Sequence, residues 1–409
     1  MHILILSDNF PPEVNAAANR VYERACYWVD WGHQVTVITS APNFPQGKIY
    51  HGYKNKWWQQ EIMHGITVIR VKTFMAPNRG FFLRTLDFFS YMCMAGLMGM
   101  HQPKPDIIIA TSPQIFTAIA GWWLAKIKKT PWLLELSDLW PASIAAVGAI
   151  KNKKILCWLE KLELLLYRKA STIVALTQSF KNNLIQRGIT PDKINVVLNG
   201  VDLNHFSPCN KNLMLLKKFD LLDKFVVGYI GTHGMAHNLI NILHAARALQ
   251  NSNIHFIFIG DGAEKNTLIE TAKEWQLQNV TFFPQMPRKQ IVDYWSMCDV
   301  TLIHLKNHPT FAEVIPSKIM EAIAMCIPIV ACVPPGEASA IVASEGCGIC
   351  IDAENYSTLE KTLLELQENP HELINMQSRA QAIRHHYSRE KQASEYLQSI
   401  ENYHLNCLK

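Results

Sequence analysis

The chain of 409 residues exceeds what one ordinary hydrophobic core supports, so two domains of about 200 residues are expected. A content of 49% hydrophobic and 18% charged residues excludes a disordered chain, and a modest net charge of +5 gives no argument for a nucleic-acid partner. Residues 1–8 lack the basic segment and the long apolar run of a signal peptide. We therefore expect a cytoplasmic protein whose 10 cysteines are reduced thiols, with the CxxC at Cys347–Cys350 too isolated to predict a metal site.

The first half alternates apolar strands with helices. The predicted elements are strands over 2–7, 34–39, 66–71, 132–136, 173–177 and 194–198, helices over 20–31 and 81–100, and a strand followed by a helix within 107–125. This order predicts βαβ units around a parallel sheet, in which ligands bind beyond the carboxyl ends of the strands.

Two of these strand ends carry candidate functional residues. The loop after the first strand runs from Asp8 through two prolines to Glu13 and Asn15, and small residues at 16–18 would let a substrate approach the backbone. Close packing of the next helix on the sheet explains those small residues equally well. Asp138 follows the strand over 132–136, where catalytic and ligand groups gather, although it could equally cap the next helix.

The segment over 79–170 combines apolar and basic residues. The uncharged run in the helix over 81–100 is shorter than the roughly 20 residues of a membrane span, so a buried helix is favoured and a helix docked in the lipid interface is the alternative. Lysine and arginine number 12 in 79–170 against six acidic residues, and Lys126 lies close to Trp122 and Trp123. Such a mixture suits an anionic membrane surface as well as a solvated basic face.

The second half restarts the same pattern. The predicted elements are strands over 225–230, 255–259, 280–283, 300–305 and 327–332, a helix over 239–249 and a helical, polar tail from His371. The turns at Gly231 and Gly260 follow strands directly, which allows a backbone to approach a phosphate or a base. We expect a doubly wound domain at 1–205, a second one at 206–385, a ligand cleft between them, and a tail at 386–409 that packs toward the first domain.

The segment 311–325 follows the strand over 300–305. Pro316 predicts the start of a short helix, whose first turn offers free N–H groups and a positive dipole end to a phosphate. Lys318 lies in that turn, where a cation is disfavoured unless an anion is also present. Glu313 and Glu321 could bind polyols on either side of the phosphate, which is the shape of a nucleotide sugar. The alternative is an ordinary amphipathic helix with a Lys318–Glu321 surface pair.

Seven motifs cover nearly the whole chain: Asp8–Glu13, Asn43–Tyr50, Asp138–Pro141, Asn199–Asp202, Gly231–Asn238, Gly260–Gly262 and the Glu313–Glu321 pair. With these residues the chain resembles the family 4 retaining glycosyltransferases of GT-B fold, whose E-x7-E motif corresponds to the last pair. It looks closest to the bacterial branch that builds O-antigen, lipopolysaccharide and capsule units, including the L-fucosamine transferases called WbuB.

The resemblance implies an α/β architecture of two doubly wound Rossmann-like domains that face each other across a cleft. It also implies transfer of a sugar, here an N-acetylated amino sugar, from a UDP-linked donor to a glycan or polyprenyl-linked acceptor with retention of anomeric configuration. The site residues carried over are Glu313 and Asp138 as catalytic, Gly231, Thr232, His237, Gly260, Asp261, Ser317, Lys318, Ile319 and Glu321 as donor-binding, and Glu13 and Asn15 as acceptor-binding.

The chain departs from the family pattern in three places. Many members carry arginine and lysine where this chain has Thr232 and His237, so Lys318, aided by His237, would have to neutralise the pyrophosphate. Residues 15–17 replace glycines that are common in the first loop. Cys326 replaces the glycine usual after the E-x7-E helix, a position that often needs a positive φ.

The implied chemistry needs little beyond the substrates. The departing phosphate would accept the proton of the acceptor hydroxyl, and the chain has no D-x-D motif, so no cofactor and no essential metal are expected. Expected partners are a nucleotide sugar, the acceptor and the inner face of the cytoplasmic membrane, but no nucleic acid. Two other classes remain open: a sugar-nucleotide epimerase of the same layout, and a non-catalytic protein that binds sugar nucleotides.

Overall fold

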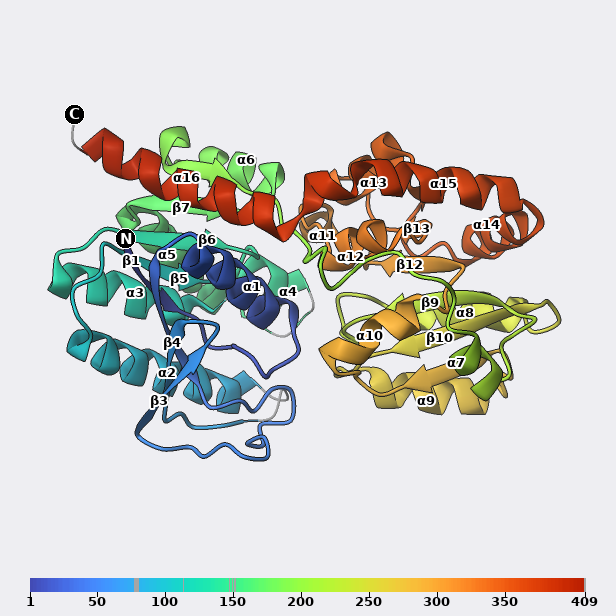
Figure 1. Ribbon diagram of the computed structural model, residues 1–409, viewed down its shortest axis with the longest axis horizontal. Coiled ribbons are helices and arrows are strands. Elements are labelled where there is room, and N and C mark those ends of the chain that lie inside the picture. The colour runs from blue at the N-terminus through green and yellow to red at the C-terminus, as the bar shows by residue number, and fades with distance from the viewer. Residues whose placement is uncertain (77–80, 113, 147, 149, 151, 408–409) are drawn as a thin grey trace. The chain divides into compact units, whose positions relative to one another are not determined.

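The computed structural model describes residues 1–76, 81–112, 114–146, 148, 150 and 152–407 (Figure 1). It divides into two compact units, unit 1 with Met1–Asn199 and Arg389–Lys409, and unit 2 with Gly200–Ser388. These limits differ by a few residues from the boundaries at 205 and 385 predicted from the sequence. The last two residues of the predicted tail lie outside the described part of the chain.

Unit 1 is built on an eight-stranded sheet with the order β3-β4-β2-β1-β5-β6-β7-β8. Its strands are β1 (His2–Leu6), β2 (Gln34–Ser40), β3 (Trp58–Met63), β4 (Ile66–Val71), β5 (Ile107–Thr111), β6 (Trp132–Leu136), β7 (Thr172–Ala175) and β8 (Ile194–Val196). Only the β3–β4 pair among these is antiparallel. Strand β3 was not predicted from the sequence, because this edge strand is only half-buried and largely polar.

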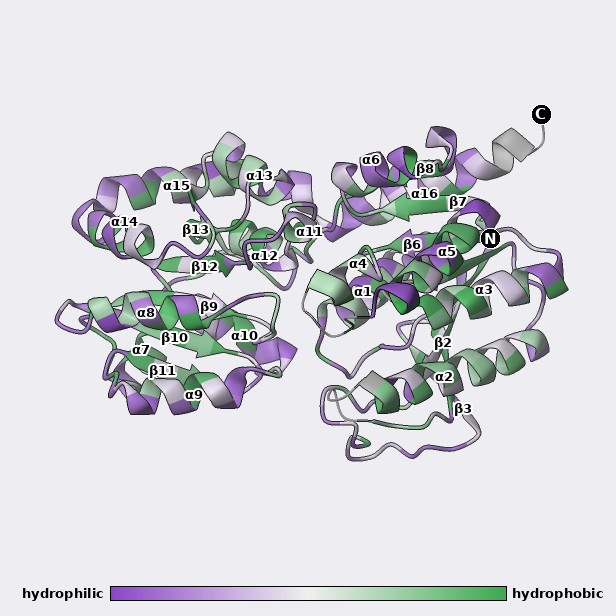
Figure 2. Cartoon of the chain, turned by 180° about the vertical axis from the view of Figure 1, so that it is seen from behind, coloured by the Kyte–Doolittle hydropathy of each residue, from purple (hydrophilic) through white to green (hydrophobic). Residues whose placement is uncertain are grey.

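Helices cover both faces of this sheet. They are α1 (Ala16–Asp30), α2 (Phe81–His101), α3 (Ile115–Lys128), α4 (Ala142–Ala146), α5 (Lys153–Lys169), α6 (Gln178–Gln186) and α16 (Arg389–Cys407). Helix α1 connects β1 to β2 on one side of β1, whereas α2 and α3 lead to β5 and β6 on the other side. Because crossovers are right-handed, α1 lies on one face of the sheet and α2 and α3 lie on the other. Figure 1 shows α1 beside α16, and Figure 2 shows α2 beside α3 from behind.

The helix α16 belongs to unit 1 through buried contacts with α1. The rings of Trp28 and Tyr396 lie 5.4 Å apart, and Arg24 lies over the Tyr396 ring. Arg24 also forms a buried ion pair with Glu135 on β6. Burial opposes the charge of Glu135, yet Arg24 and Arg20 hold the pKa of its carboxyl at about 2. A paired, hydrogen-bonded charge is the form in which a carboxylate tolerates such burial.

Unit 2 is built on a six-stranded parallel sheet with the order β11-β10-β9-β12-β13-β14. The strands are β9 (Phe225–Ile230), β10 (Ile254–Ile259), β11 (Val280–Phe283), β12 (Val300–His304), β13 (Ile329–Cys332) and β14 (Gly348–Ile351). The CxxC at Cys347–Cys350 overlaps β14, which the sequence analysis did not predict as a strand. All nine cysteines whose side chains are described are free thiols.

The helices of unit 2 precede, connect or follow these strands. They are α7 (Leu213–Lys218), α8 (Ile240–Ala248), α9 (Lys265–Glu274), α10 (Arg288–Trp295), α11 (Pro309–Ala312), α12 (Ser317–Met325), α13 (Glu337–Glu345), α14 (Tyr356–Glu368) and α15 (Pro370–Ile383), with short 3-10 turns at Pro191–Lys193 in unit 1 and Arg384–Tyr387 in unit 2.

Both sheets reverse their strand order once. In unit 1 the reversal lies between β1 and β5, and in unit 2 between β9 and β12. Ligands of open α/β sheets bind in the crevice outside the carboxyl ends of the strands at such a point. The fold therefore predicts one ligand site at the ends of β1 and β5 and another at the ends of β9 and β12.

Candidate functional site

The glycine turns after β9 and β10 touch each other through their backbones. A Cβ atom built on Gly260 would lie 1.9 Å from the carbonyl oxygen of Gly231, and one built on Gly262 would lie 2.4 Å from the carbonyl oxygen of His233. Both positions also have a positive φ, 145° and 159° respectively. Only glycine fits such a close approach, so the two turns form one compact surface.

Hydrogen bonds fix the shape of this surface. Tyr229 donates its hydroxyl to the Thr232 carbonyl oxygen at 2.8 Å, and the backbone N–H of His233 donates to the Asp261 carbonyl oxygen at 2.9 Å. The Asp261 carboxylate accepts from the N–H of Gly262 at 2.8 Å. The Asp261 side chain is therefore held at the rim of the turn, where the sequence analysis expected a group close to the nucleotide.

Helix α12 starts beside these turns with an uncapped end. Pro316 is its N-cap rather than its first helical residue, and it offers no side-chain hydrogen bond to the first turn. Ile319 donates its N–H to the Pro316 carbonyl oxygen at 3.0 Å. The backbone at Ser317 and Lys318 thus begins a nine-residue helix whose positive end is available to an anion. Cys326 ends the helix with a φ of 55°, as the glycine usual at this position would.

Lys318 is buried at the start of α12 and is only 7% exposed. Its Nζ atom has no hydrogen-bond partner in the described structure and lies 3.9 Å above the Tyr229 ring. A Cβ atom on Gly231 would lie 3.2 Å from this nitrogen. Burial lowers the pKa of Lys318 to about 7, with Glu321 acting in the opposite direction. The interpretation of Lys318–Glu321 as a surface pair is therefore wrong, because the lysine is not at the surface.

His237 does not supply the positive charge expected from the sequence. Its Nδ1 atom lies 3.1 Å from the His304 carbonyl oxygen, and His304 Nδ1 in turn contacts the His237 carbonyl oxygen. Burial and the nearby Lys318 lower the pKa of His237 to about 3, so its ring is neutral at physiological pH. Lys318 is left as the one cation among the donor-site residues named from the sequence.

The two carboxylates of the E-x7-E motif come from different elements. Glu313 ends the short helix α11, and Glu321 lies half-buried on α12, one to two turns beyond the helix start. A Cβ atom on Gly336 would lie 2.0 Å from the Ala312 carbonyl oxygen, so the backbone before Glu313 is held closely. Both carboxylates therefore belong to the segment that also presents the α12 end.

In unit 1 the ends of β1 and β5 meet in a small cavity. Gln114 Nε2 donates to Asp8 Oδ2 at 2.6 Å across the point where the strand order reverses. The cavity has a volume of about 70 Å³ and is also lined by Asn43, Arg84 and Asp87. Burial raises the pKa of Asp8. Burial, together with the charge of Asp8, raises the pKa of Asp87 to about 7.

Glu13 and Asn15 lie close to this cavity but have structural contacts of their own. Glu13 Oε1 accepts backbone N–H bonds from Asn43 at 2.7 Å and Phe44 at 2.8 Å, and burial raises the pKa of this carboxyl to about 7. Asn15 caps α1 by accepting the N–H of Ala18 at 2.9 Å. Glu13 thus shapes the Asn43 loop that lines the cavity, and Asn15 sets the start of α1.

Asp138 lies in a second crevice of unit 1. It lines a space between the end of β6 and helix α5, together with Gln114, Glu163 and Tyr167. Burial raises the pKa of Asp138, while hydrogen bonds from Ser143 and from the Leu139 backbone oppose that effect. Since Gln114 also lines the Asp8 cavity, the two spaces are neighbours.

Sequence reasoning missed Gln114, Arg84 and Asp87 as site residues. Gln114 could have been found from the position of β5 beside β1, which brings their carboxyl ends together. Arg84 and Asp87 come from the first turns of α2, a helix whose path over the sheet no local pattern reveals.

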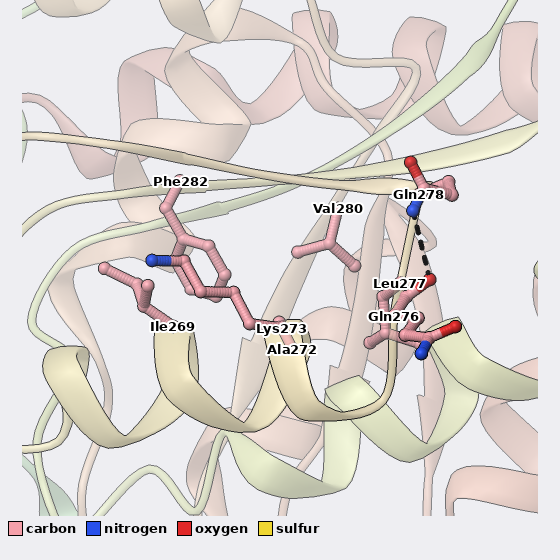
Figure 3. Close-up of a pocket in the computed structure, with 8 residues that line it drawn as sticks. All are labelled: Ile269, Ala272, Lys273, Gln276, Leu277, Gln278, Val280 and Phe282. Carbon is pink, nitrogen blue, oxygen red and sulfur yellow. Dashed lines mark hydrogen bonds between the residues drawn. The ribbon is translucent and has the colours of Figure 1, made fainter.

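A further cavity of unit 2 lies away from these residues (Figure 3). It has a volume of about 420 Å³ and is formed by the last turns of α9 and the start of the edge strand β11, with Ile269, Lys273 and Phe282 among its lining residues. The carboxyl edge of the sheet, where Gly231 lies, is the opposite edge. No group of three or more potential metal ligands occurs among the described residues.

Comparison with known proteins finds one matching domain in each of the two units. Residues 15–200 match the model of the glycosyl transferase 4-like domain, and residues 216–384 match that of glycosyl transferases group 1. WcaI of Escherichia coli, assigned as a glycosyl transferase of colanic acid biosynthesis, is 25% identical over 80% of this chain and 81% of its own length. A GDP-mannose-dependent alpha-mannosyltransferase of Mycobacterium tuberculosis is 22% identical over 81% and 79%.

The fold has solved counterparts. The structure of Anabaena HepE with UDP and glucose superimposes with a TM-score of 0.73 at 18% identity, covering 98% of this chain and 99% of HepE. The prediction of two Rossmann-like α/β domains of GT-B type is thereby confirmed. The chain is a glycosyltransferase of GT-B fold, with a 4-like domain in its first unit and a group 1 domain in its second.

Proposed function

We propose that the protein transfers a sugar from a UDP-linked donor to a glycan or polyprenyl-linked acceptor with retention of anomeric configuration, during synthesis of a surface polysaccharide. Unit 2 binds the donor and unit 1 binds the acceptor. The observation that carries this proposal is the buried, unpartnered Nζ of Lys318 at the uncapped start of α12, beside the Gly231 turn.

These features suit a pyrophosphate. The first N–H groups of α12 and the Lys318 amine would both interact with phosphate oxygens, and the compact glycine turns leave room for them. An anion would also raise the pKa of Lys318 and return the proton that burial disfavours. We place the ribose hydroxyls at Glu321, the donor sugar at Glu313, and the nucleotide close to Asp261.

The choice of donor rests on relatives. HepE binds UDP and glucose, which supports a UDP-sugar, and the resemblance to the WbuB branch supports an N-acetylated amino sugar. The mycobacterial relative uses GDP-mannose, which makes that donor the comparison to include in a test. WcaI, from colanic acid synthesis, supports a surface polysaccharide as the product.

We place the acceptor hydroxyl in unit 1, at the cavity that Asp8 and Gln114 line, with Asp138 facing the reacting sugar. Glu13 and Asn15 hold the loops around this cavity. The positive charge of Lys318 and the α12 dipole stabilise the leaving diphosphate, and its oxygen takes the proton from the acceptor hydroxyl. The protein would act in the cytoplasm, in peripheral contact with the inner membrane.

A transfer assay tests this function. A panel of UDP-sugars and GDP-mannose is incubated with lipid-linked acceptor extract, and the anomeric configuration of the product is read by NMR. Glu321→Ala should weaken nucleotide binding, and Glu313→Ala should reduce turnover more than affinity. The exposed Glu270→Ala on α9 is the matched control and should behave as wild type.

The outcomes separate the classes. A product that forms from the nucleotide sugar alone would identify an epimerase, and UDP binding without any product would identify a binding protein. Near-wild-type transfer by both Glu321→Ala and Glu313→Ala would refute the assignment of the donor site.

A further inference from the structure

Helix α2 exposes an apolar stripe to solvent along its length. Phe82 is 78% exposed, Leu86 40%, Phe89 48% and Leu97 42%. Steps of three, four or eight residues keep these side chains, with the exposed Cys93 between them, on one face of the helix. The expectation of a buried helix in this region is therefore wrong for this face.

The stripe continues onto α3. A Cβ atom on Gly96 would lie 2.9 Å from the Trp123 ring, and one on Gly99 would lie 2.5 Å from Leu124, so these glycines bring the two helices close together. Trp123 remains 44% exposed and Ile127 46%. Figure 2 shows the two helices side by side on one face of unit 1, with many hydrophobic positions. We define Phe82, Leu86, Phe89, Leu97, Trp123 and Ile127 as the α2–α3 face.

The charges beside this face are mostly positive, and Asp106, exposed in the turn after α2, is an acidic exception. Lys126 and Lys129 are exposed at the end of α3, and Lys104 is exposed just after α2. The only acidic residue of α2 is the buried Asp87, and α3 has none. An apolar face with a basic rim, tryptophan included, complements the interface of an anionic lipid bilayer.

We infer that the α2–α3 face docks into the headgroup region of an anionic phospholipid bilayer. Phe82, Leu86 and Leu97 enter the boundary of the acyl chains, and Lys126 and Lys129 contact lipid phosphates. No helix among the described residues is long and apolar enough to cross a membrane, so this contact lies along the surface. The inference deepens the peripheral contact proposed above by naming the surface that makes it.

The position of α2 links this face to the acceptor cavity. Arg84, Asp87 and Phe88 line the cavity from the first turns of the helix, and Phe82 and Leu86 on the same turns belong to the docking face. A hydroxyl carried by a lipid headgroup would then be held close to Asp8 while its chain stays in the bilayer. This link rests on the proposed function, whereas binding to the bilayer does not.

Vesicle co-sedimentation of the full chain tests the inference. Wild type should bind vesicles of phosphatidylcholine with phosphatidylglycerol and release them as salt is raised, and should bind phosphatidylcholine alone more weakly. Phe82→Ser with Leu97→Ser should lower the partition coefficient about tenfold or more. The matched control, Leu213→Ser with Met214→Ser on α7, removes side chains that are 63% and 82% exposed and should leave binding unchanged.

A charge pair tests the basic rim. Lys126→Glu with Lys129→Glu should weaken binding to the anionic vesicles and flatten its salt dependence. The control, Lys217→Glu with Lys289→Glu, makes the same charge change at exposed sites of unit 2 and should leave vesicle binding unchanged. Circular dichroism verifies that each variant is folded, and UDP binding by each should equal that of wild type.

Three results would overturn the inference. The first is equal vesicle binding by all variants, and the second is equal binding to charged and neutral vesicles. The third is a wild type that binds no vesicles and sediments as a dimer, with Phe82→Ser and Leu97→Ser together dissociating this dimer. If a variant of the α2–α3 face loses vesicle binding but transfers normally to a water-soluble acceptor, the docking face is supported independently of the proposed function. Failure of transfer with every acceptor, while vesicle binding persists, would count against the proposed function alone.

Discussion

Replacing Lys318 by methionine should stabilise the protein while weakening its binding of the donor. The amine is buried without a hydrogen-bond partner, and its pKa falls from an ordinary 10.5 to about 7. Methionine keeps a similar volume and removes the cost of burying a charge.

The size of the effect follows from the pKa. Between pH 7 and 10.5 the unfolded chain holds a proton at Lys318 that the folded chain lacks, so stability rises with pH across this window and is lost as pH falls through it. At 1.36 kcal/mol per pKa unit, the penalty is about 4 kcal/mol at pH 7 and about 1 kcal/mol at pH 9.5. Lys318→Met removes the penalty at both values.

Urea unfolding followed by circular dichroism measures this difference. Lys318→Met should be more stable than wild type by an amount that shrinks by about 3 kcal/mol between pH 7 and pH 9.5. Lys217→Met, at an exposed position, serves as control and should leave the free energy of unfolding unchanged at both pH values. A Lys318→Met variant that is no more stable than wild type at pH 7, or that follows the same pH dependence, would refute the interpretation of Lys318 as a buried, readily deprotonated amine.

Four further changes test other parts of the structure. Glu321→Gln should lower UDP affinity about tenfold by calorimetry, the value of one charged hydrogen bond. Gly260→Ala should lower the free energy of unfolding by more than about 3 kcal/mol, because its Cβ would meet the Gly231 carbonyl oxygen. Asp87→Asn should remove a loss of stability that wild type shows as pH rises from about 4 to about 7, since burial raises the pKa of this carboxyl to about 7. Deleting residues 389–407 should expose Trp28 and lower the thermal midpoint of unit 1 in calorimetry.

Much of the fold could be predicted from the sequence because parallel strands buried on both faces are continuous apolar runs. Each of the 12 strands expected from such runs has a counterpart in the structure. The strands that were missed, β3 and β14, are edge strands with only partial burial, so neither shows a clear apolar run. The helix over 20–31 in fact begins at Ala16, because Asn15 caps it.

The candidate site could be predicted from the sequence only in part. Motif spacing located Gly231, Gly260 and the α12 start, because each follows directly from a strand end or a proline. It did not reveal that Lys318 is buried against Tyr229, or that His237 is buried against His304, since both contacts join segments more than 60 residues apart. The pairing of Asp8 with Gln114 likewise depends on β5 lying beside β1 rather than on any local pattern.

The central claim is that the donor diphosphate binds at the start of α12 beside Lys318. Calorimetric titration of UDP at pH 8, repeated in buffers of different ionisation enthalpy, tests this claim most directly. A lysine with a pKa of about 7 is about nine-tenths neutral at pH 8, so UDP binding should take up about 0.9 proton in wild type and none in Lys318→Met. UDP binding by wild type without proton uptake, or with the same affinity in Lys318→Met, would contradict the claim.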